Sequence, residues 1–359
     1  MTRVLLVAGL MSVVSAQAQA PGPVQIQNGR IETRAGAAID REIAAASAPG
    51  STEPVWIAWR TPMIAGDRDM CGWYSDRLGT VRGISMDEDF RSPQIVAPKG
   101  PVPLEAGTGL VVLVRAVGGK VERLRTLGDD CPIDAGGRSV FWLSSITPAE
   151  SLRFLNGLTR PIAADRSMFD QERQLASSAV RAMGFHADGA ADAMLDTLAA
   201  SHTDSSVRHQ AATTLTAYRG AHGAATVTRL IGTTKDNERR SLVTALGQSR
   251  EPSTTETFRS LTRDADAGVR SEAAHYLVVR GGAQVIPEAM KLATSDADAS
   301  LRKRVLSDIA RLPGNAGIAS LIDLARTTQN AAIRKDAVSA LSQSTDSRAI
   351  AFMEEILKR

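Results

Sequence analysis

The second half of the chain repeats one short phrase at a nearly constant interval. "GVRSEAAHYL" begins at residue 268, and related phrases carry an Arg every 31 or 32 residues. Three residues after each Arg stands a small or aliphatic residue, and seven after it stands Leu or Ile. Because these positions share one helical face, each phrase predicts an amphipathic helix, named here the A helix. The marking residues are Arg208, Arg239, Arg270, Arg302 and Arg334.

A second apolar face follows each phrase in the same register. Gly and Pro residues separate it from the A helix, so each unit is predicted to be helix, turn, helix. We name the second helix B; its marker residues are Leu230, Leu261, Leu292, Leu324 and Ile356. A less regular unit around Arg173 precedes these five. A helix pair cannot bury its apolar face alone, so the period predicts an α-solenoid of six pairs over residues 168–359.

The phrases "DADAGVRSEAAHYL" and "DSSVRHQAATTL" resemble the first helix of HEAT and HEAT-like repeats, in which Asp, Val-Arg, Ala and Leu occur in that order. The resemblance implies the solenoid fold. It also implies a protein-binding scaffold, since that is the usual role of such repeats. One branch of the family forms bilin lyases and a few members act on nucleic acid. The packing residues themselves carry none of these activities.

The Arg of each A helix lies inside the apolar stripe, where a charge needs a partner. An acidic residue stands three or four positions earlier in four repeats: Asp204, Asp236, Asp266 and Asp298. These carboxylates can cap the A helix, and they can pair with the Arg of the same or the next repeat. We therefore expect a structural ladder of Asp and Arg. The alternative is a row of Arg that binds an anionic ligand.

Residues 24–158 predict a separate α+β domain, joined to the solenoid by a linker at 159–167. The alternation around Asn28-Gly29 predicts a hairpin, and a second hairpin is expected to turn at Gly118-Gly119. Thr147 is predicted to cap a closing helix. The arrangement resembles the Cys-containing regions that precede HEAT repeats in exported bacterial proteins of unassigned function.

Residues 1–18 have the pattern of a signal peptide, with a basic residue, a short apolar run and small residues; cleavage after residue 20 is the alternative. No Cys stands directly after the apolar run to carry a lipid anchor, and no later stretch is apolar enough to span a bilayer. We expect a periplasmic or secreted protein. In an oxidising compartment, Cys71 and Cys131 predict a disulfide.

The sequence offers little for catalysis. All five His lie in the second half, which excludes a Ser-His-Asp or Cys-His site from the first. His186, His202, His209 and His222 have no spacing that sets two metal ligands on one helical face. We therefore expect no metal, no cofactor and no catalytic residues. The alternative is a small-ligand or enzyme site in the N-terminal domain around Trp73, Asp129 and Asp130.

The charge balance argues against nucleic acid as a partner. The formal net charge is +3, and residues 170–359 hold 24 basic and 22 acidic side chains. We expect a non-enzymatic scaffold of the bacterial cell envelope that binds another protein along the concave solenoid surface. The oligomeric state is left open. The B helices are expected to line that surface with Arg229, Arg259, Lys291, Asp323 and Glu355.

A second row, one residue after each A-helix Arg, is mostly basic. It consists of His209, Arg240, Ser271, Lys303 and Lys335. The row is either a solvated face or a docking site for an acidic partner.

Overall fold

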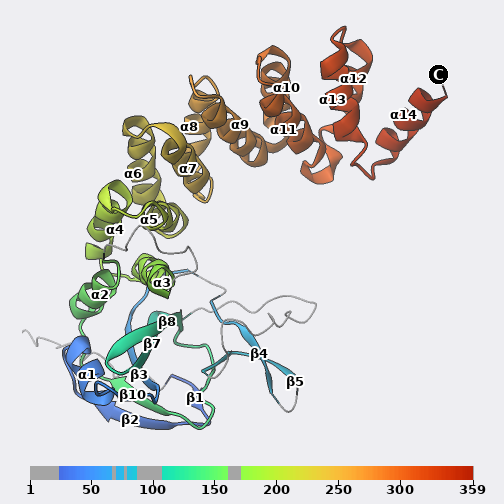
Figure 1. Ribbon diagram of the computed structural model, residues 1–359. Helices are drawn as coiled ribbons and strands as arrows, with labels where there is room; N and C mark the ends of the chain where they lie inside the picture. Colours follow the sequence, from blue (N-terminus) through green and yellow to red (C-terminus); the bar gives the residue numbers. More distant parts are fainter. Residues whose placement is uncertain (1–23, 67–69, 77–78, 87–106, 161–170, 359) are drawn as a thin grey trace, which may run out of the picture.

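The chain consists of a sheet-containing domain and a curved arm of helices (Figure 1). The structure, a computed structural model, describes residues 24–66, 70–76, 79–86, 107–160 and 171–358, except for the side chains of 73–81 and 236. The predicted fold class, a helical solenoid after a small α+β domain with one disulfide, is confirmed. The predicted signal peptide and most of the predicted linker lie outside the described residues.

The domain is built on a mixed five-stranded sheet in the order β2-β10-β3-β7-β8. Strand β10 is parallel to both of its neighbours, and the other pairs are antiparallel. The strands are β2 (Arg30–Arg34), β3 (Val55–Pro62), β7 (Gly109–Val117), β8 (Lys120–Gly128) and β10 (Ser139–Leu143). A separate antiparallel pair joins β4 (Trp73–Asp76) and β5 (Gly79–Arg82).

Both faces of this sheet are buried, which explains why its central strand reads as a continuous apolar run. Ile57 and Trp59 of β3 face helices α1 (Ile39–Ala46) and α2 (Pro148–Gly157). Trp56 and Ala58 face the other core, beneath a small sheet of β1 (Ile26–Gln27), β9 (Ile133–Asp134) and β6 (Ile84–Ser85).

One of the two predicted hairpins is wrong. The strands on either side of Asn28-Gly29 do not pair with each other: β1 pairs with β9, and β2 pairs with β10. Asn28 does have the positive φ of a tight turn, 53°. Its side chain donates a hydrogen bond to Asp134, so the turn carries the chain from one sheet to the next. The β7–β8 hairpin is confirmed, with positive φ at Gly118 and Gly119.

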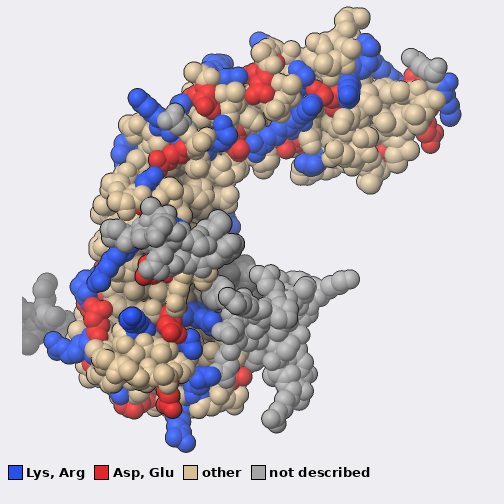
Figure 2. Space-filling model, in the orientation of Figure 1, with Lys and Arg blue, Asp and Glu red and all other residues tan. Residues whose placement is uncertain are grey.

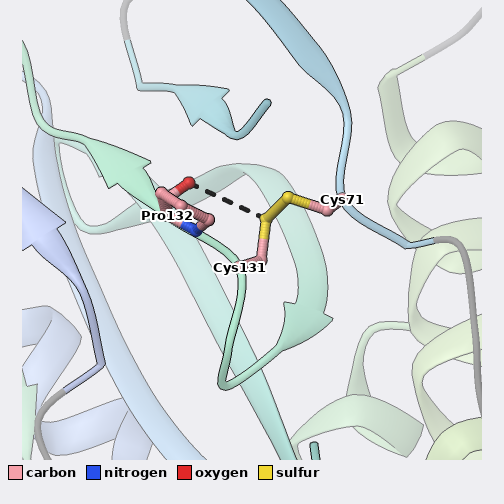
Figure 3. The surroundings of a disulfide bond; sticks show 3 residues. All are labelled: Cys71, Cys131 and Pro132. Atoms are coloured by element: carbon pink, nitrogen blue, oxygen red, sulfur yellow. Dashed lines mark hydrogen bonds between the residues drawn. A yellow bond between two sulfur atoms is a disulfide. The ribbon is translucent and has the colours of Figure 1, made fainter. Parts of the chain in front are cut away.

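The predicted disulfide is confirmed. Cys71 and Cys131 are joined with a Cα–Cα distance of 5.6 Å, and the carbonyl oxygen of Pro132 lies 3.7 Å from Cys131 Sγ (Figure 3). Both cysteines are buried in the second core of the sheet. The disulfide therefore ties the chain around Cys71 to the face of the sheet that carries Trp56.

The arm contains the six predicted helix pairs, and short 3-10 turns precede two of its B helices. The A helices are α3 (Gln171–Phe185), α5 (Ser205–Tyr218), α7 (Asp236–Leu246), α9 (Ala267–Gly281), α11 (Ala299–Ala310) and α13 (Ala331–Leu341). The B helices are α4 (Ala190–Ser201), α6 (Gly220–Thr233), α8 (Thr254–Leu261), α10 (Ile286–Ser295), α12 (Ile318–Thr327) and α14 (Ser347–Leu357).

The A helices line the inner side of the curve. Successive A helices touch at every step, from α3·α5 to α11·α13, whereas successive B helices touch only sparsely. A stack bends toward the side on which its units are closest, and Figure 1 shows the B helices on the outside of the bend. This corrects the expectation that the B helices line the concave surface.

The sheet domain and the arm share one hydrophobic core. Helix α3 packs against β8 and α2, and apolar side chains from the sheet to α9 form a single cluster. At the junction, Ile64 and Ala187 exchange backbone hydrogen bonds with Phe185 and Pro62 respectively. The domain therefore packs against the first helix pair directly. The concave surface that remains open begins at α5.

Candidate binding faces of the helical arm

The Arg of each A helix pairs with a carboxylate of the following repeat. The first five pairs along the arm are Arg173–Asp204, Arg208–Glu238, Arg239–Asp264, Arg270–Asp296 and Arg302–Asp336. Every one of these partners lies 25 to 34 residues further along the chain. Arg334 belongs to the last A helix and donates to the carbonyl of Thr328 in its own repeat. The pairs thus link neighbouring repeats.

Most of the expected acidic partners serve as helix caps instead. Asp266 and Asp298 accept hydrogen bonds from backbone N–H groups of their own helices, and Asp204 both caps its helix and pairs with Arg173. The Asp236 side chain lies outside the described atoms. In the repeats that begin at Asp266 and Asp298, the ion pairs instead use Asp264 and Asp296, which stand two residues earlier. The repeated Asp-Ala-Asp, at 264–266 and 296–298, was the available signal for this division of roles.

Arg270 shows how completely such a guanidinium is occupied. It donates two hydrogen bonds to Asp296, at 2.8 and 3.3 Å, and one each to the carbonyls of Asp264 and Ala265. The guanidinium hydrogen bond lowers the pKa of Asp296, so the pair is ionic at neutral pH. A guanidinium that already has carboxylate and carbonyl acceptors leaves few donors for an external anion.

Two polar positions recur on five of the A helices, which line the inner side of the curve. We call the residues one position after each ladder Arg the inner row: His209, Arg240, Ser271, Lys303 and Lys335. Four residues further on stand Thr213, Thr244, His275, Ser307 and Ser339. Neither set contains an acidic residue. Figure 2 shows Lys and Arg gathered over α11 and α13.

Within the described residues, Lys303 and Lys335 are exposed and make no ion pair. Arg240 extends across the start of α9, where a β-carbon at Gly268 would overlap its guanidinium. Its nearest carboxylate, Asp266, is 3.8 Å away and equally exposed. Desolvation lowers the pKa of His209, so this ring is a neutral donor or acceptor at pH 7.

The expected partner-binding residues of the B helices lie on the outer side of the arm. Arg229, Lys291 and Asp323 are exposed there. Two other members are engaged: Arg259 bonds to Glu288 at 3.0 Å and also to Glu256, and Glu355 accepts from Arg326 at 2.6 Å. The structure therefore does not bring this set into the concave surface.

The alternative site in the N-terminal domain is only partly described. Asp129 is bound by Arg60 at 2.7 Å and is largely buried. The Trp73 side chain lies outside the described atoms, and Asp130 has interactions of its own. Across the described residues, no three His, Cys, Asp or Glu side chains are grouped to hold a metal ion.

The four His considered as metal ligands are separated. His186 is fully buried at the junction, with Nε2 3.1 Å from Thr61 Oγ1. His202 lies 2.7 Å from the carbonyl of Thr159, and His222 lies 3.1 Å from Asp196. His209 has a hydrogen bond with the backbone of Ser241, so each of the four rings has a local structural contact.

Comparison with known proteins identifies the repeat. Residues 225–307 and 286–359 match the family model described as HEAT repeats, so the arm from α6 onward consists of HEAT repeats. No curated protein matches the chain in sequence.

Two solved structures show limited likeness to the arm. The complex of CpcE and CpcF, the phycocyanin lyase from a Nostoc species, is 18% identical, with a TM-score of 0.30. The match covers 57% of this chain and 80% of that one. Human deoxyhypusine hydroxylase in complex with glycerol is 13% identical, also with a TM-score of 0.30, over 57% of this chain and 90% of its own. Neither likeness bears on what this chain does.

Proposed function

We propose that this protein is a non-enzymatic scaffold of the bacterial cell envelope that binds another protein along its concave surface. One observation carries the proposal: polar residues recur at the same two positions of five successive A helices, and the ion pairs that join the repeats lie beside them. Curved solenoids bind partners along extended concave surfaces of this kind.

The envelope location is supported by the sequence of residues 1–18 and by the disulfide. Disulfides persist in oxidising compartments and are rare in the bacterial cytosol. In the described part of the chain, every helix is too short or too polar to cross a bilayer. Fractionation followed by N-terminal sequencing should find mature protein outside the cytoplasm that begins at Gln19. Recovery in the cytoplasm with Met1 intact would contradict this location.

Site-specific crosslinking can test which face binds. A photoreactive amino acid would replace Ser271 or Ser339 on the inner side, and Lys291 or Asp323 on the outer side, in the full-length chain. After irradiation in intact cells, the inner positions should repeatedly crosslink to the same envelope protein, because a partner in the curve contacts neighbouring repeats.

The outer positions are the matched control, since Lys291 shares a repeat with Ser271 and Asp323 lies in the repeat before Ser339. Equal crosslinking from both sides would contradict a concave binding site. Crosslinking of no protein from any position would contradict the scaffold itself.

A further inference from the structure

We infer that the inner row binds an acidic polypeptide segment in the polyproline II conformation, with Asp or Glu at every third residue. The inference rests on the proposed function and specifies the chemistry of its partner. Three properties of the inner row carry it: the sign of its charge, its spacing and its width.

The charge of the row is positive and available. Lys303 and Lys335 are exposed and make no ion pair within the described residues, and Arg240 has only a carboxylate at 3.8 Å. Ser271 lies between them and adds a hydroxyl donor, which suits a carboxylate oxygen. The positions four residues further on are Thr, Ser and His, and the one carboxylate bonded to this set, Asp308, is engaged by His275 at 2.8 Å.

The spacing of the row matches one backbone conformation. Adjacent packed helices lie about 8–10 Å apart, so the row presents one donor roughly every 9 Å. A polyproline II chain has three residues per turn and rises about 9 Å in that turn. Every third side chain therefore points the same way at the pitch of the repeats. In a β-strand, by contrast, residues three apart point to opposite faces.

The inner row is narrow, and this excludes polyanions whose negative charge is spread more widely than the row. Carboxylates flank it on both sides, with Asp266 and Asp298 at the helix N-termini and Glu272 and Asp308 on the A helices. A nucleic acid or a continuous polyphosphate would place negative charge over these flanks. A flat bilayer cannot enter the concave side. A peptide with two uncharged residues between acids meets the donors only.

Peptide binding tests the inference directly. The probe is a labelled peptide of about 15 residues, the length that spans five repeats at three residues each, with Glu at every third position among Ser, Gln and Pro. Fluorescence anisotropy would measure its dissociation constant for the full-length protein. A peptide of the same composition with its Glu residues clustered should bind at least tenfold more weakly.

The protein variants are matched in charge. Lys303→Glu with Lys335→Glu should weaken binding of the spaced peptide tenfold or more, about 1.4 kcal/mol. Arg229→Glu with Lys291→Glu makes the same change of charge on the outer side and should change binding less than twofold. Circular dichroism would verify that both variants keep their helices.

Several results would overturn the inference. These are equal binding of the spaced and clustered peptides, equal loss in the inner and outer variants, or binding of polyphosphate or phosphatidylglycerol vesicles that needs the same two lysines. If the photoreactive residue at Ser271 still crosslinks its protein in the Lys303→Glu, Lys335→Glu variant, the acidic segment is wrong while the scaffold stands. Loss of all crosslinks in the parent chain would remove the scaffold instead.

Discussion

At the scale of single residues, the ladder Arg links its repeat to the next one, although its position suggests packing within its own helix pair. It stands in the stripe that its own helix uses for packing, yet its carboxylate partner belongs to the next repeat. Removing one member of a partly buried pair leaves the other charge without compensation, which costs more than the pair contributes net. The ladder therefore penalises any separation of neighbouring repeats.

Arg270→Ala should lower the free energy of unfolding by about 2–4 kcal/mol, since it leaves Asp296, which is 10% exposed, without its guanidinium. Arg334→Ala is the matched control. It occupies the same helical position in α13, where it is exposed and donates to the carbonyl of Thr328 in its own repeat, and its loss should cost about 0.5 kcal/mol or less. Urea denaturation measures both. Equal effects would show that contact with the next repeat is immaterial.

His186 gives the junction a dependence on pH. Desolvation lowers the pKa of this buried ring to about 4, with Arg219 acting in the same direction and Asp188 opposing it. Its Nδ1 has no hydrogen-bond partner among the described residues. The unfolded chain binds a proton near pH 6.5 and the folded chain only near pH 4, so stability falls as pH decreases through this window.

For this single group the loss amounts to about 3 kcal/mol between pH 6.5 and 4. His186→Gln should remove that part of the pH dependence while keeping a polar group beside Thr61. Urea denaturation at pH 7 and pH 5 measures the difference, and a variant with an unchanged pH profile would show that another group is responsible. His222→Gln, at an exposed ion pair, is the control.

At the scale of helices, the A and B helices are stabilised differently at their N-termini. Four A helices, α5, α9, α11 and α13, begin with a side chain that accepts a backbone N–H bond. In the described structure, the B helices α4, α6, α8, α10 and α12 begin without one, whereas α14 is capped by Asp346. The A helix α7 also begins without a side-chain cap, so capping is more frequent among the A helices but is not confined to them.

Asp298→Ala should lower stability by about 1 kcal/mol, because the N–H groups of Ser300 and Leu301 lose their acceptor. Ser253→Ala makes the comparable change at the start of α8, where the side chain caps nothing, and should be nearly neutral. Thermal unfolding followed by circular dichroism would compare them. Similar losses would contradict the assignment of capping to the A helices.

The sequence predicted the helices better than the contacts between them. The 31- to 32-residue period fixed six pairs, because each apolar position must meet the same position of a neighbour. It could not show that Arg270 selects Asp296 rather than Asp298, since both lie before the same helix. Nor could it show which helices line the curve, because curvature depends on the relative closeness of two sets of contacts. The sequence shows the row that includes Lys303, but it does not show that the helices carrying this row line the concave side.

At the scale of the whole molecule, the buried apolar side chains divide in an unexpected place. One cluster runs from the sheet through the first helix pairs into α9, and a second runs from α9 to α14. Helix α9 contributes Leu277 to the first and Val278 to the second. The core boundary therefore falls inside the arm, whereas the sequence suggested a boundary near residue 160. All four Trp lie in the sheet domain, and Trp59 belongs to the first cluster.

Leu215→Ala and Leu321→Ala test this division, because each removes a fully buried side chain and should cost about 2–5 kcal/mol. Leu215 lies in the first cluster, so its loss should lower the midpoint of unfolding seen by Trp fluorescence. Leu321 lies in the second, and its loss should lower the circular-dichroism midpoint with little change in fluorescence. A common shift for both variants would mean that the arm and the sheet unfold as one unit.

The unequal contacts on the two sides of the arm also set its mechanics. The A helices touch at every step and resist further compression, whereas the B helices touch only sparsely and can approach or part without breaking A–A contacts. Bending is therefore soft in one plane, the plane of the curve, and stiff across it. The curvature of the arm, and with it the distance between its two ends, can therefore change. A partner that binds several inner positions at once would hold the arm at one curvature.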